Sequence, residues 1–354
     1  MGACTVKEAL TAKNLTTTAC GDPIRDSSAA YATTSNVLAG IICFAVLQRI
    51  VSKLYWRLGI SADDWTILVT TIFFTVPSLV INIHGMVANG LGRDVWTVPF
   101  DEITRFGGFF QAMAVLYFAQ IMMIKLTLLF FLLRIFPKHM TRNVILGTML
   151  FNIVFGLTFV ITAIFQCLPV GYFARRWERD ASEGSCIDIN AFVWSHAAIS
   201  IALDIWMLAI PLSRLHTLNL DWKKKIGVAL MFFVATGFTI VSIIRLRTLV
   251  AFGSSYNVTW DYVAVARWST IEIAIGVICA CMPSFRLLIK KMVPVLTSIA
   301  STSGSREPKQ QVTGTDRVRT HSEGPIMRKA ADDQLQHTEL EMNDVRAWNA
   351  ENGR

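Results

Sequence analysis

The membrane character of this chain is clearest in the stretch RWSTIEIAIGVICACMPSFRLLIKK, residues 267–291. Its apolar run is long enough to cross a bilayer, and basic residues stand at both ends. One acid, Glu272, interrupts the run. Because an ionised carboxylate in hydrocarbon is costly, such a residue usually faces the interior of a helix bundle and finds a partner there. The stretch therefore predicts a membrane helix that packs against other helices through Glu272.

The composition extends this prediction to most of the chain. Hydrophobic residues make up 53% and charged residues 16% of the 354 residues, and the mean hydropathy is +0.48. A water-soluble protein this apolar would have too few polar residues to cover its surface. We therefore predict an all-α, polytopic membrane protein, a bundle of seven transmembrane helices. The predicted spans are residues 36–55, 65–88, 106–133, 144–166, 191–212, 226–252 and 262–290.

Two patterns indicate the sidedness of the bundle. With the N-terminus outside, Lys and Arg residues gather at the segment ends that face the cytoplasm, which is the usual bias of membrane proteins. The two N-x-S/T sequons, at Asn14 and Asn257, then both fall outside. We predict that both asparagines are glycosylated. The chain is expected to be a multi-pass integral membrane protein of the plasma membrane rather than of an internal membrane.

This topology divides the chain into three regions. Residues 1–34 are an extracellular N-terminal tail, and residues 35–291 are the seven-transmembrane domain. Residues 292–354 are rich in Ser, Thr, Gly, Gln and charge, which is typical of a disordered cytoplasmic tail. The first span is interrupted by polar residues, including Arg49 and Lys53, and it is retained because the sidedness of both sequons depends on it.

The positions of the cysteines agree with the predicted topology. Cys167 and Cys186 lie in the predicted outer loop between spans four and five, where an oxidising compartment favours a disulfide. Cys4 and Cys20 form a second candidate pair in the outer tail. The remaining three cysteines fall within spans and are expected to be packing residues.

Charges within the spans are the main indication of a functional site. Lys125 is nine residues before Arg134, and Asp204 is ten residues before Arg214. At 1.5 Å per residue both lie about 14–15 Å from the cytoplasmic face. Two opposite charges at one depth predict an intramembrane ion pair between Lys125 and Asp204. The pair is either a structural brace between helices or part of a switch.

A second group of charges lies further out. Glu272 falls about 21 Å from the cytoplasmic face, near mid-membrane, and Arg245 and Arg267 fall about 28–30 Å from it. His84 and His196 are expected to contribute to the same outer basic ring. The candidate ligand-binding residues are therefore Glu272, Arg245, Arg267 and His84. For Arg245 the alternative is that its side chain extends to the outer interface.

The motifs of common cofactor and catalytic sites are absent from the sequence. The chain contains no P-loop, no GxGxxG after a strand, no HExxH, no GxSxG and no paired CxxC. SADDW at 61–65 is typical of a helix start, where Ser61 caps and the two acids meet the positive helix terminus. We predict no cofactor, no metal, no catalytic residue and no nucleic-acid partner.

An ordered set of motifs resembles a known family. They are SADDWTIL (61–68), KLTLLFFLLRIF (125–136), FQCLPV (165–170), DIWMLAIP (204–211), KKKIGVALMFFVATGFTIVSIIRL (223–246) and WSTIE with CMPSFRLL (268–287). Over residues 35–291 the chain is similar to the fungal rhodopsin-domain family of seven-helix membrane proteins. That family includes receptor-like surface sensors of plant-pathogenic fungi and membrane proteins of satratoxin-type metabolite clusters. The tail at 4–26 resembles the closing part of a CFEM module and is identified as a remnant of one.

The family resemblance does not imply a retinal pigment. A retinal Schiff base needs a lysine deep in the last span, and residues 262–286 contain none. What the resemblance implies is a receptor-like protein that senses an extracellular or membrane-derived cue and signals to the cytoplasm. Its expected partners are membrane lipid, a small apolar ligand and a cytoplasmic signalling protein.

The alternative function is that of a membrane protein in a fungal secondary-metabolite pathway. Such a protein would act as an enzyme or a transporter on an apolar metabolite, with Glu272 or Asp204 as the acid or base. Catalysis is expected only under this alternative.

Overall fold

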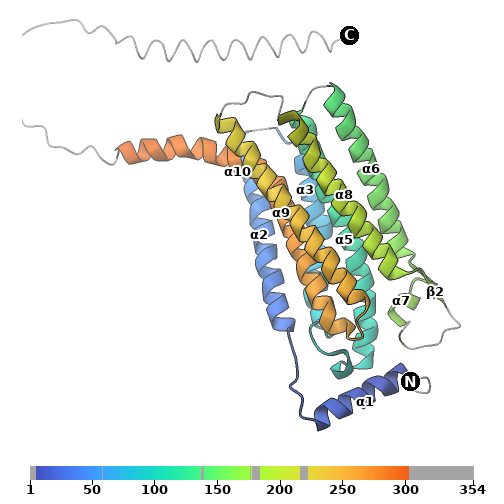
Figure 1. The fold of residues 1–354 in the computed structure, drawn as a ribbon. Helices are drawn as coiled ribbons and strands as arrows, with labels where there is room; N and C mark the ends of the chain where they lie inside the picture. The colour runs from blue at the N-terminus through green and yellow to red at the C-terminus, as the bar shows by residue number, and fades with distance from the viewer. Residues whose placement is uncertain are drawn as a thin grey trace, which may run out of the picture. The chain divides into compact units, whose positions relative to one another are not determined.

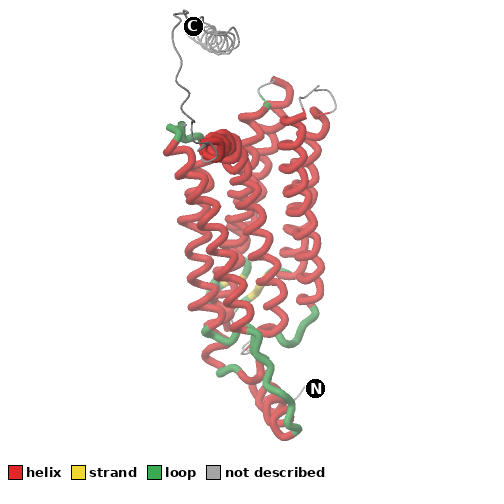
Figure 2. Tube along the Cα trace, turned by 90° about the vertical axis from the view of Figure 1, so that its left-hand side faces the viewer, coloured by secondary structure: helices red, strands yellow, loops and turns green. Residues whose placement is uncertain are grey.

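The computed structural model describes residues 5–57, 59–136, 139–175, 177, 184–215 and 222–302. Within that part of the chain, seven helical segments are long and apolar enough to span a membrane. They run side by side as one bundle (Figure 1), and a view turned by 90° shows the same arrangement (Figure 2). The predicted all-α bundle of seven helices is confirmed.

The spans belong to the following elements. They are α2 (Ser28–Tyr55), the segment Ala62–Val87, α5 (Phe100–Ile135), α6 (His139–Ile164), α8 (Ile189–Leu215), the Phe233–Gly253 part of α9 (Trp222–Gly253) and the Val258–Met282 part of α10 (Val258–Thr302). In α5 and α10, 56% of the apolar 18-residue stretch of the span is buried, whereas the buried share is 22–39% in the other spans. These two helices therefore form the centre of the bundle.

Several helices extend beyond their predicted ends. The helix α2 begins at Ser28 rather than 36, so its first two turns lie within the stretch predicted as the tail. The helix α10 continues past 290 to Thr302. A hydropathy pattern detects only the apolar part of a helix, whereas polar turns beyond the hydrocarbon continue it in water. Residues 303–354 of the predicted cytoplasmic tail lie outside the described residues.

The second span is not a regular α-helix. It consists of α3 (Ala62–Thr70), a π-helical segment η1 (Thr71–Thr75), α4 (Val76–Val80) and a second π-helical segment η2 (Ile81–Val87). Each π turn holds more residues than an α turn and rotates the side chains that follow, and such turns are frequent at functional sites. The rotation decides which residues of this span face the bundle.

The N-terminal tail contains a helix, α1 (Val6–Ala19). Its first turn has a capping box, in which Thr5 N donates to Glu8 Oε2 at 2.7 Å and Glu8 N donates to the Thr5 hydroxyl at 3.4 Å. These bonds lower the pKa of Glu8. The ionised carboxylate therefore stabilises the cap at any pH above the usual pKa of a glutamate, and this stabilisation is lost as the pH falls through the lowered pKa. Leu10 packs with the 3₁₀ helix η3 (Val95–Thr97). We call this end of the bundle the α1 end.

The CFEM resemblance of this tail stays a prediction. Cys4 lies outside the described residues, and Cys20 is exposed and forms no disulfide with any cysteine that the structure describes.

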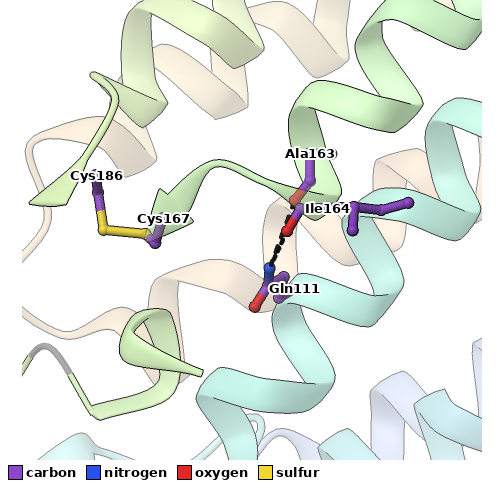
Figure 3. Close-up of a disulfide and its surroundings, with 5 residues drawn as sticks. All are labelled: Gln111, Ala163, Ile164, Cys167 and Cys186. Carbon is purple, nitrogen blue, oxygen red and sulfur yellow. Dashed lines mark hydrogen bonds between the residues drawn. A yellow bond between two sulfur atoms is a disulfide. The ribbon is translucent and has the colours of Figure 1, made fainter. Parts of the chain in front are cut away.

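The loop after α6 is closed by a small hairpin. The strand β1 (Cys167–Leu168) pairs antiparallel with β2 (Ser185–Cys186), and a disulfide joins Cys167 to Cys186. The short helix α7 (Tyr172–Arg175) lies within this loop. Gln111 of α5 donates to the carbonyl oxygens of Ala163 and Ile164, at 3.5 and 3.2 Å, and so satisfies the last turn of α6 beside the disulfide (Figure 3).

We expect the disulfide to stabilise this loop in the purified protein. Cys167→Ser together with Cys186→Ser should lower the free energy of unfolding by roughly 3 kcal/mol, because a closed loop of this length restricts the unfolded chain. Thermal unfolding in detergent measures the loss, and Cys43→Ser, at an exposed free cysteine, is the control. Mass spectrometry without reductant should find the bridge, and two free thiols in the native protein would contradict the expectation.

Candidate functional site

Lys125 of α5 and Asp204 of α8 meet inside the bundle. Lys125 Nζ lies 2.8 Å from Asp204 Oδ1, and both side chains are buried. Lys125 Nζ also donates to the Ser200 carbonyl oxygen at 2.6 Å and to the Ser200 hydroxyl at 2.8 Å. The Asp204 oxygens accept no aligned hydrogen bond from the described residues, so the contact is a close ion pair without hydrogen-bond geometry. The ammonium group is therefore better satisfied than the carboxylate.

Glu272 of α10 is held by two other helices. The Tyr117 hydroxyl of α5 donates to Glu272 Oε2 at 2.6 Å, and the Ser242 hydroxyl of α9 donates to Oε1 at 2.6 Å. Arg245 Nε lies 3.6 Å from Oε2. All four side chains are buried. The acid that interrupts the last span thus joins α5, α9 and α10, as its place in an apolar run predicts.

Arg245 is not part of a separate outer ring above Glu272. Its guanidinium carbon lies 3.9 Å from the centroid of the Tyr117 ring, and its Nε donates to the Ser269 hydroxyl at 3.2 Å. Side chains tilt toward the N-terminus of their helix. Because α9 and α10 are consecutive antiparallel spans, this tilt brings Arg245 and Glu272 toward the same level. A depth counted along the backbone misses this convergence.

These contacts form one system, which we call the central charge network. It consists of Lys125, Asp204, Arg245 and Glu272 with the hydroxyl groups of Tyr117, Ser200, Ser242 and Ser269. Asp204 interacts electrostatically with Glu272, and the Ser242 hydroxyl that donates to Glu272 also lies close to Asp204, so the two ion pairs are neighbours. Two cations and two anions leave the network neutral overall. It connects α5, α8, α9 and α10, which makes it sensitive to any relative movement of these helices.

His196 extends the polar face of α8. The residues His196, Ser200 and Asp204 are spaced four apart and lie on one side of the helix. The His196 ring is fully buried against Phe118, Phe155 and Phe159, with ring centroids 4.4, 5.2 and 5.0 Å away. Its Nδ1 has no hydrogen-bond partner among the described residues.

The two remaining candidates have different environments. His84 is exposed, because Asn82, Gly85 and Met86 form the buried face of η2 and His84 points away from it. The His84 side chain thus lies away from the central contacts described above, and its part in ligand binding stays a prediction. Arg267 is partly buried, and its Nε is fully buried without a hydrogen-bond partner in the described part of the chain.

A second buried charge cluster lies at the opposite end of the bundle, where α2 finishes. We call Arg49, Lys53, Asp63 and Asp64 the opposite-end cluster. Arg49 Nε donates to Asp64 Oδ1 at 2.8 Å, and the same guanidinium also pairs with Asp63 and donates to the Ala280 carbonyl of α10. Lys53 pairs with Asp64. The cluster therefore fastens α2 to α3 and to α10.

The opposite-end cluster was not predicted from the sequence. Ser61 and Asp64 do form the expected capping box, but Asp64 also accepts from two cations. The available signal was the spacing of Arg49 and Lys53 by one helical turn near the end of the first span. Two acids open the second span after a short loop, so antiparallel neighbours place all four charges at one depth.

The two sequon asparagines lie outside the central spans. Asn14 is partly buried on α1, and the amide nitrogen of Asn257 donates to Asp94 Oδ1 at 2.7 Å. Asn257 Oδ1 accepts from Val95 N at 2.9 Å. Asp94 also pairs with Arg25 at 2.6 Å, so this set of contacts joins the start of α2, η3 and the start of α10.

The chemistry available to the central network is proton and charge rearrangement between side chains. No group of three His, Cys, Asp or Glu residues within the described ranges is close enough to hold a metal ion. The hydroxyl groups and the Asp204 oxygens can exchange hydrogen bonds when helices shift, and each exchange changes which buried carboxylate a hydroxyl group stabilises.

Comparison with known proteins places these features in a family. A model of the fungal rhodopsin domain matches residues 48–291. The chain is 28% identical over 221 residues to the SAT4 family membrane protein of Emericella nidulans, covering 62% of this chain and 55% of that protein. It is 24% identical over 207 residues to the satratoxin biosynthesis SC1 cluster protein 4 of Stachybotrys chartarum, covering 57% of this chain and 74% of that protein.

A more distant relative carries the name of a receptor. The chain is 20% identical over 251 residues to the receptor GIN3 of Arthrobotrys oligospora, covering 70% of this chain and 60% of that protein. The chain spans 55% of the length of the Emericella relative and 60% of the Arthrobotrys receptor. No solved structure matches it.

Proposed function

The chain belongs to the fungal rhodopsin-domain family, and from that premise we propose that it is a receptor-like sensor that signals to the cytoplasm. It is an integral, multi-pass membrane protein with seven apolar spans. The cue it senses is extracellular or membrane-derived. The observation that carries the proposal is the central charge network, in which four spans share two buried ion pairs.

The network supports sensing because buried charges have few stable arrangements. Separating Lys125 from Asp204 leaves an uncompensated charge, so intermediate positions of the helices are unfavourable. A ligand in the outer half of the bundle, close to Arg245, favours whichever arrangement it contacts better. Its differential affinity for the two arrangements then sets the size of the response.

The helix α10 provides the route to the opposite end. Glu272 and Ala280 are eight residues apart on this helix, or about 12 Å along its axis. Glu272 belongs to the central network, and the Ala280 carbonyl accepts from Arg49. A displacement of α10 at Glu272 therefore changes the contact with Arg49. We place the docking of a cytoplasmic signalling protein at this end.

The proposal requires the α1 end to lie outside the cell. Glycosidase treatment of protein made in a eukaryotic host should increase its mobility, and Asn14→Gln and Asn257→Gln should each remove part of that shift. Asn190→Gln, at an asparagine of the same end without a sequon, is the control. Protection of both sequons in the cytoplasm would overturn the orientation. The plasma membrane is the proposed location.

A second candidate function follows from the satratoxin-cluster relative. It is that of a membrane protein in a secondary-metabolite pathway, an enzyme or transporter for an apolar metabolite in which Glu272 or Asp204 moves a proton. The name of that relative favours this candidate, and the name of the Arthrobotrys receptor favours the first. Buried ion pairs that connect helices fit a conformational role more directly than proton transfer to a substrate.

The two candidates differ in what they change first in the cell. Strains that express the wild-type chain or Glu272→Gln at equal surface level are compared by transcriptome and by metabolite profile. A sensor changes transcription before any metabolite changes. Accumulation of a metabolite in the Glu272→Gln strain, with transcription unaltered, would contradict the sensor and support the pathway protein.

A further inference from the structure

Arg267 carries a positive charge that no described residue compensates. Its Nε is buried and has no hydrogen-bond partner, and no acid of the described ranges pairs with it. The nearest acid along α10 toward the bundle centre, Glu272, is engaged by Arg245. The nearest acid in the other direction, Asp261, accepts from Ser255.

The other cations that the structure describes at the α1 end are either paired with an acid or exposed. Arg25 pairs with Asp94, and Arg93 lies 3.4 Å from Asp26. Arg247 of α9 is exposed and needs no protein partner. Among the described residues of this half, Arg267 is thus the cation that is partly enclosed by protein and has no acidic partner. An anion from outside the chain would remove the cost of that unpaired charge.

Arg267 directly follows Ala266 and lies one helical turn after Val263, two members of a buried hydrophobic cluster. Tyr31 lies within reach of its charge, but the Tyr31 hydroxyl donates to Asn82 Oδ1 at 2.8 Å and is fully buried. Tyr31 packs in a cluster with the buried side chains of Met86, Leu91, Phe106, Val263 and Ala266. A cationic group therefore lies beside a hydrophobic cluster shared by α2, η2, α5 and α10.

We infer that Arg267 and this hydrophobic cluster bind an amphiphile with one anionic head group. The carboxylate or phosphate of the ligand pairs with Arg267, and its hydrocarbon body packs against the partly buried side chains at the edge of the cluster, among them Val87 and Phe109. Two sources share this chemistry, an anionic membrane lipid and a free fatty-acid-like compound. The inference deepens the proposed function by naming the ligand class. Binding itself does not depend on signalling.

The test uses the full-length protein in an uncharged maltoside detergent and three probes of equal chain length. Dodecanoate and dodecyl phosphate should raise the midpoint of thermal unfolding, whereas dodecanol should not. Arg267→Gln should weaken binding of both anions by about tenfold or more, and Arg247→Gln, at the exposed arginine of α9, should leave binding unchanged. Arg267→Lys should keep part of the affinity because it keeps the charge.

A second arm distinguishes the two sources. Wild-type protein is placed in nanodiscs of phosphatidylcholine alone or with phosphatidylglycerol. Stabilisation by phosphatidylglycerol that removes the further effect of dodecanoate identifies a lipid site, and an undiminished effect of dodecanoate identifies a site for a free amphiphile. Equal stabilisation by dodecanol, or an undiminished anion response in Arg267→Gln, overturns the inference. If Arg267→Gln does not fold, Arg267→Lys decides, because the inference predicts a partial loss of anion affinity in that variant and none in Arg247→Gln. No signalling is measured, so failure here is separate from failure of the sensor proposal.

Discussion

Lys125→Met is expected to lower the free energy of unfolding by about 3–5 kcal/mol, because it leaves Asp204 buried without its cation. Asp204 has no aligned hydrogen bond from another described residue. Asp204→Leu is expected to cost less, since Lys125 keeps its two hydrogen bonds to Ser200. The geometry therefore predicts unequal losses from the two partners of one ion pair.

The double change Lys125→Met with Asp204→Leu should recover much of the loss, because no orphan charge remains. Thermal unfolding in detergent and surface expression measure the recovery, and Ile205→Val, at an exposed position of α8, is the control. Recovery of yield without signalling would identify the pair as a switch, and recovery of both would identify it as a brace. Additive losses in the double variant would contradict an interaction between the two residues.

The second large effect is expected at Arg49. Arg49→Met removes the cation that contacts two acids and the Ala280 carbonyl, and leaves Asp63 without the only cation that it contacts within the described ranges. We expect a loss of about 3–5 kcal/mol in the free energy of unfolding. Asp64 loses less, because Lys53 still pairs with it.

Adding Asp63→Asn to Arg49→Met should therefore restore part of the stability. The second change removes the carboxylate that the first one leaves without a cation. Arg142→Met, at an exposed arginine near the start of α6, is the matched control and should change stability little. Thermal unfolding in detergent measures the stability of the three variants. A loss no larger for Arg49→Met than for the control would show that the opposite-end cluster does not hold these helices together.

Hydropathy and depth counting predicted much of this fold and one of its contacts. The seven spans follow from apolar runs, and Lys125 with Asp204 follows because both were counted from the same face along adjacent helices. Counting residues along the helices also gave Arg245 and Glu272 different depths, because such a count locates the backbone and not the charged group. A long side chain that tilts along its helix moves its charge by a full turn or more.

Other features depend on contacts that a single sequence does not reveal. His84 fits a ring of outer cations by depth, but the buried face of η2 is set by two π turns, and His84 lies on the other side. Arg49 interrupts an apolar run, and only its packing against α3 turns that interruption into a buried cluster. The helix α1 is mostly polar, and its position depends on contacts with η3.

The central claim is that α10 transmits a change from the central network to the opposite end. Cys281 of α10 is fully buried beside Arg49, and Cys279 is also buried on the same helix, so peptide-resolved alkylation reports both thiols in one sample. The account predicts that Glu272→Gln, well below its unfolding temperature, raises the alkylation rate of Cys281 by about tenfold, the effect of a shift of about 1.4 kcal/mol in local opening, while Cys279 stays protected. An unchanged rate at Cys281, or an equal rise at both thiols, would contradict it.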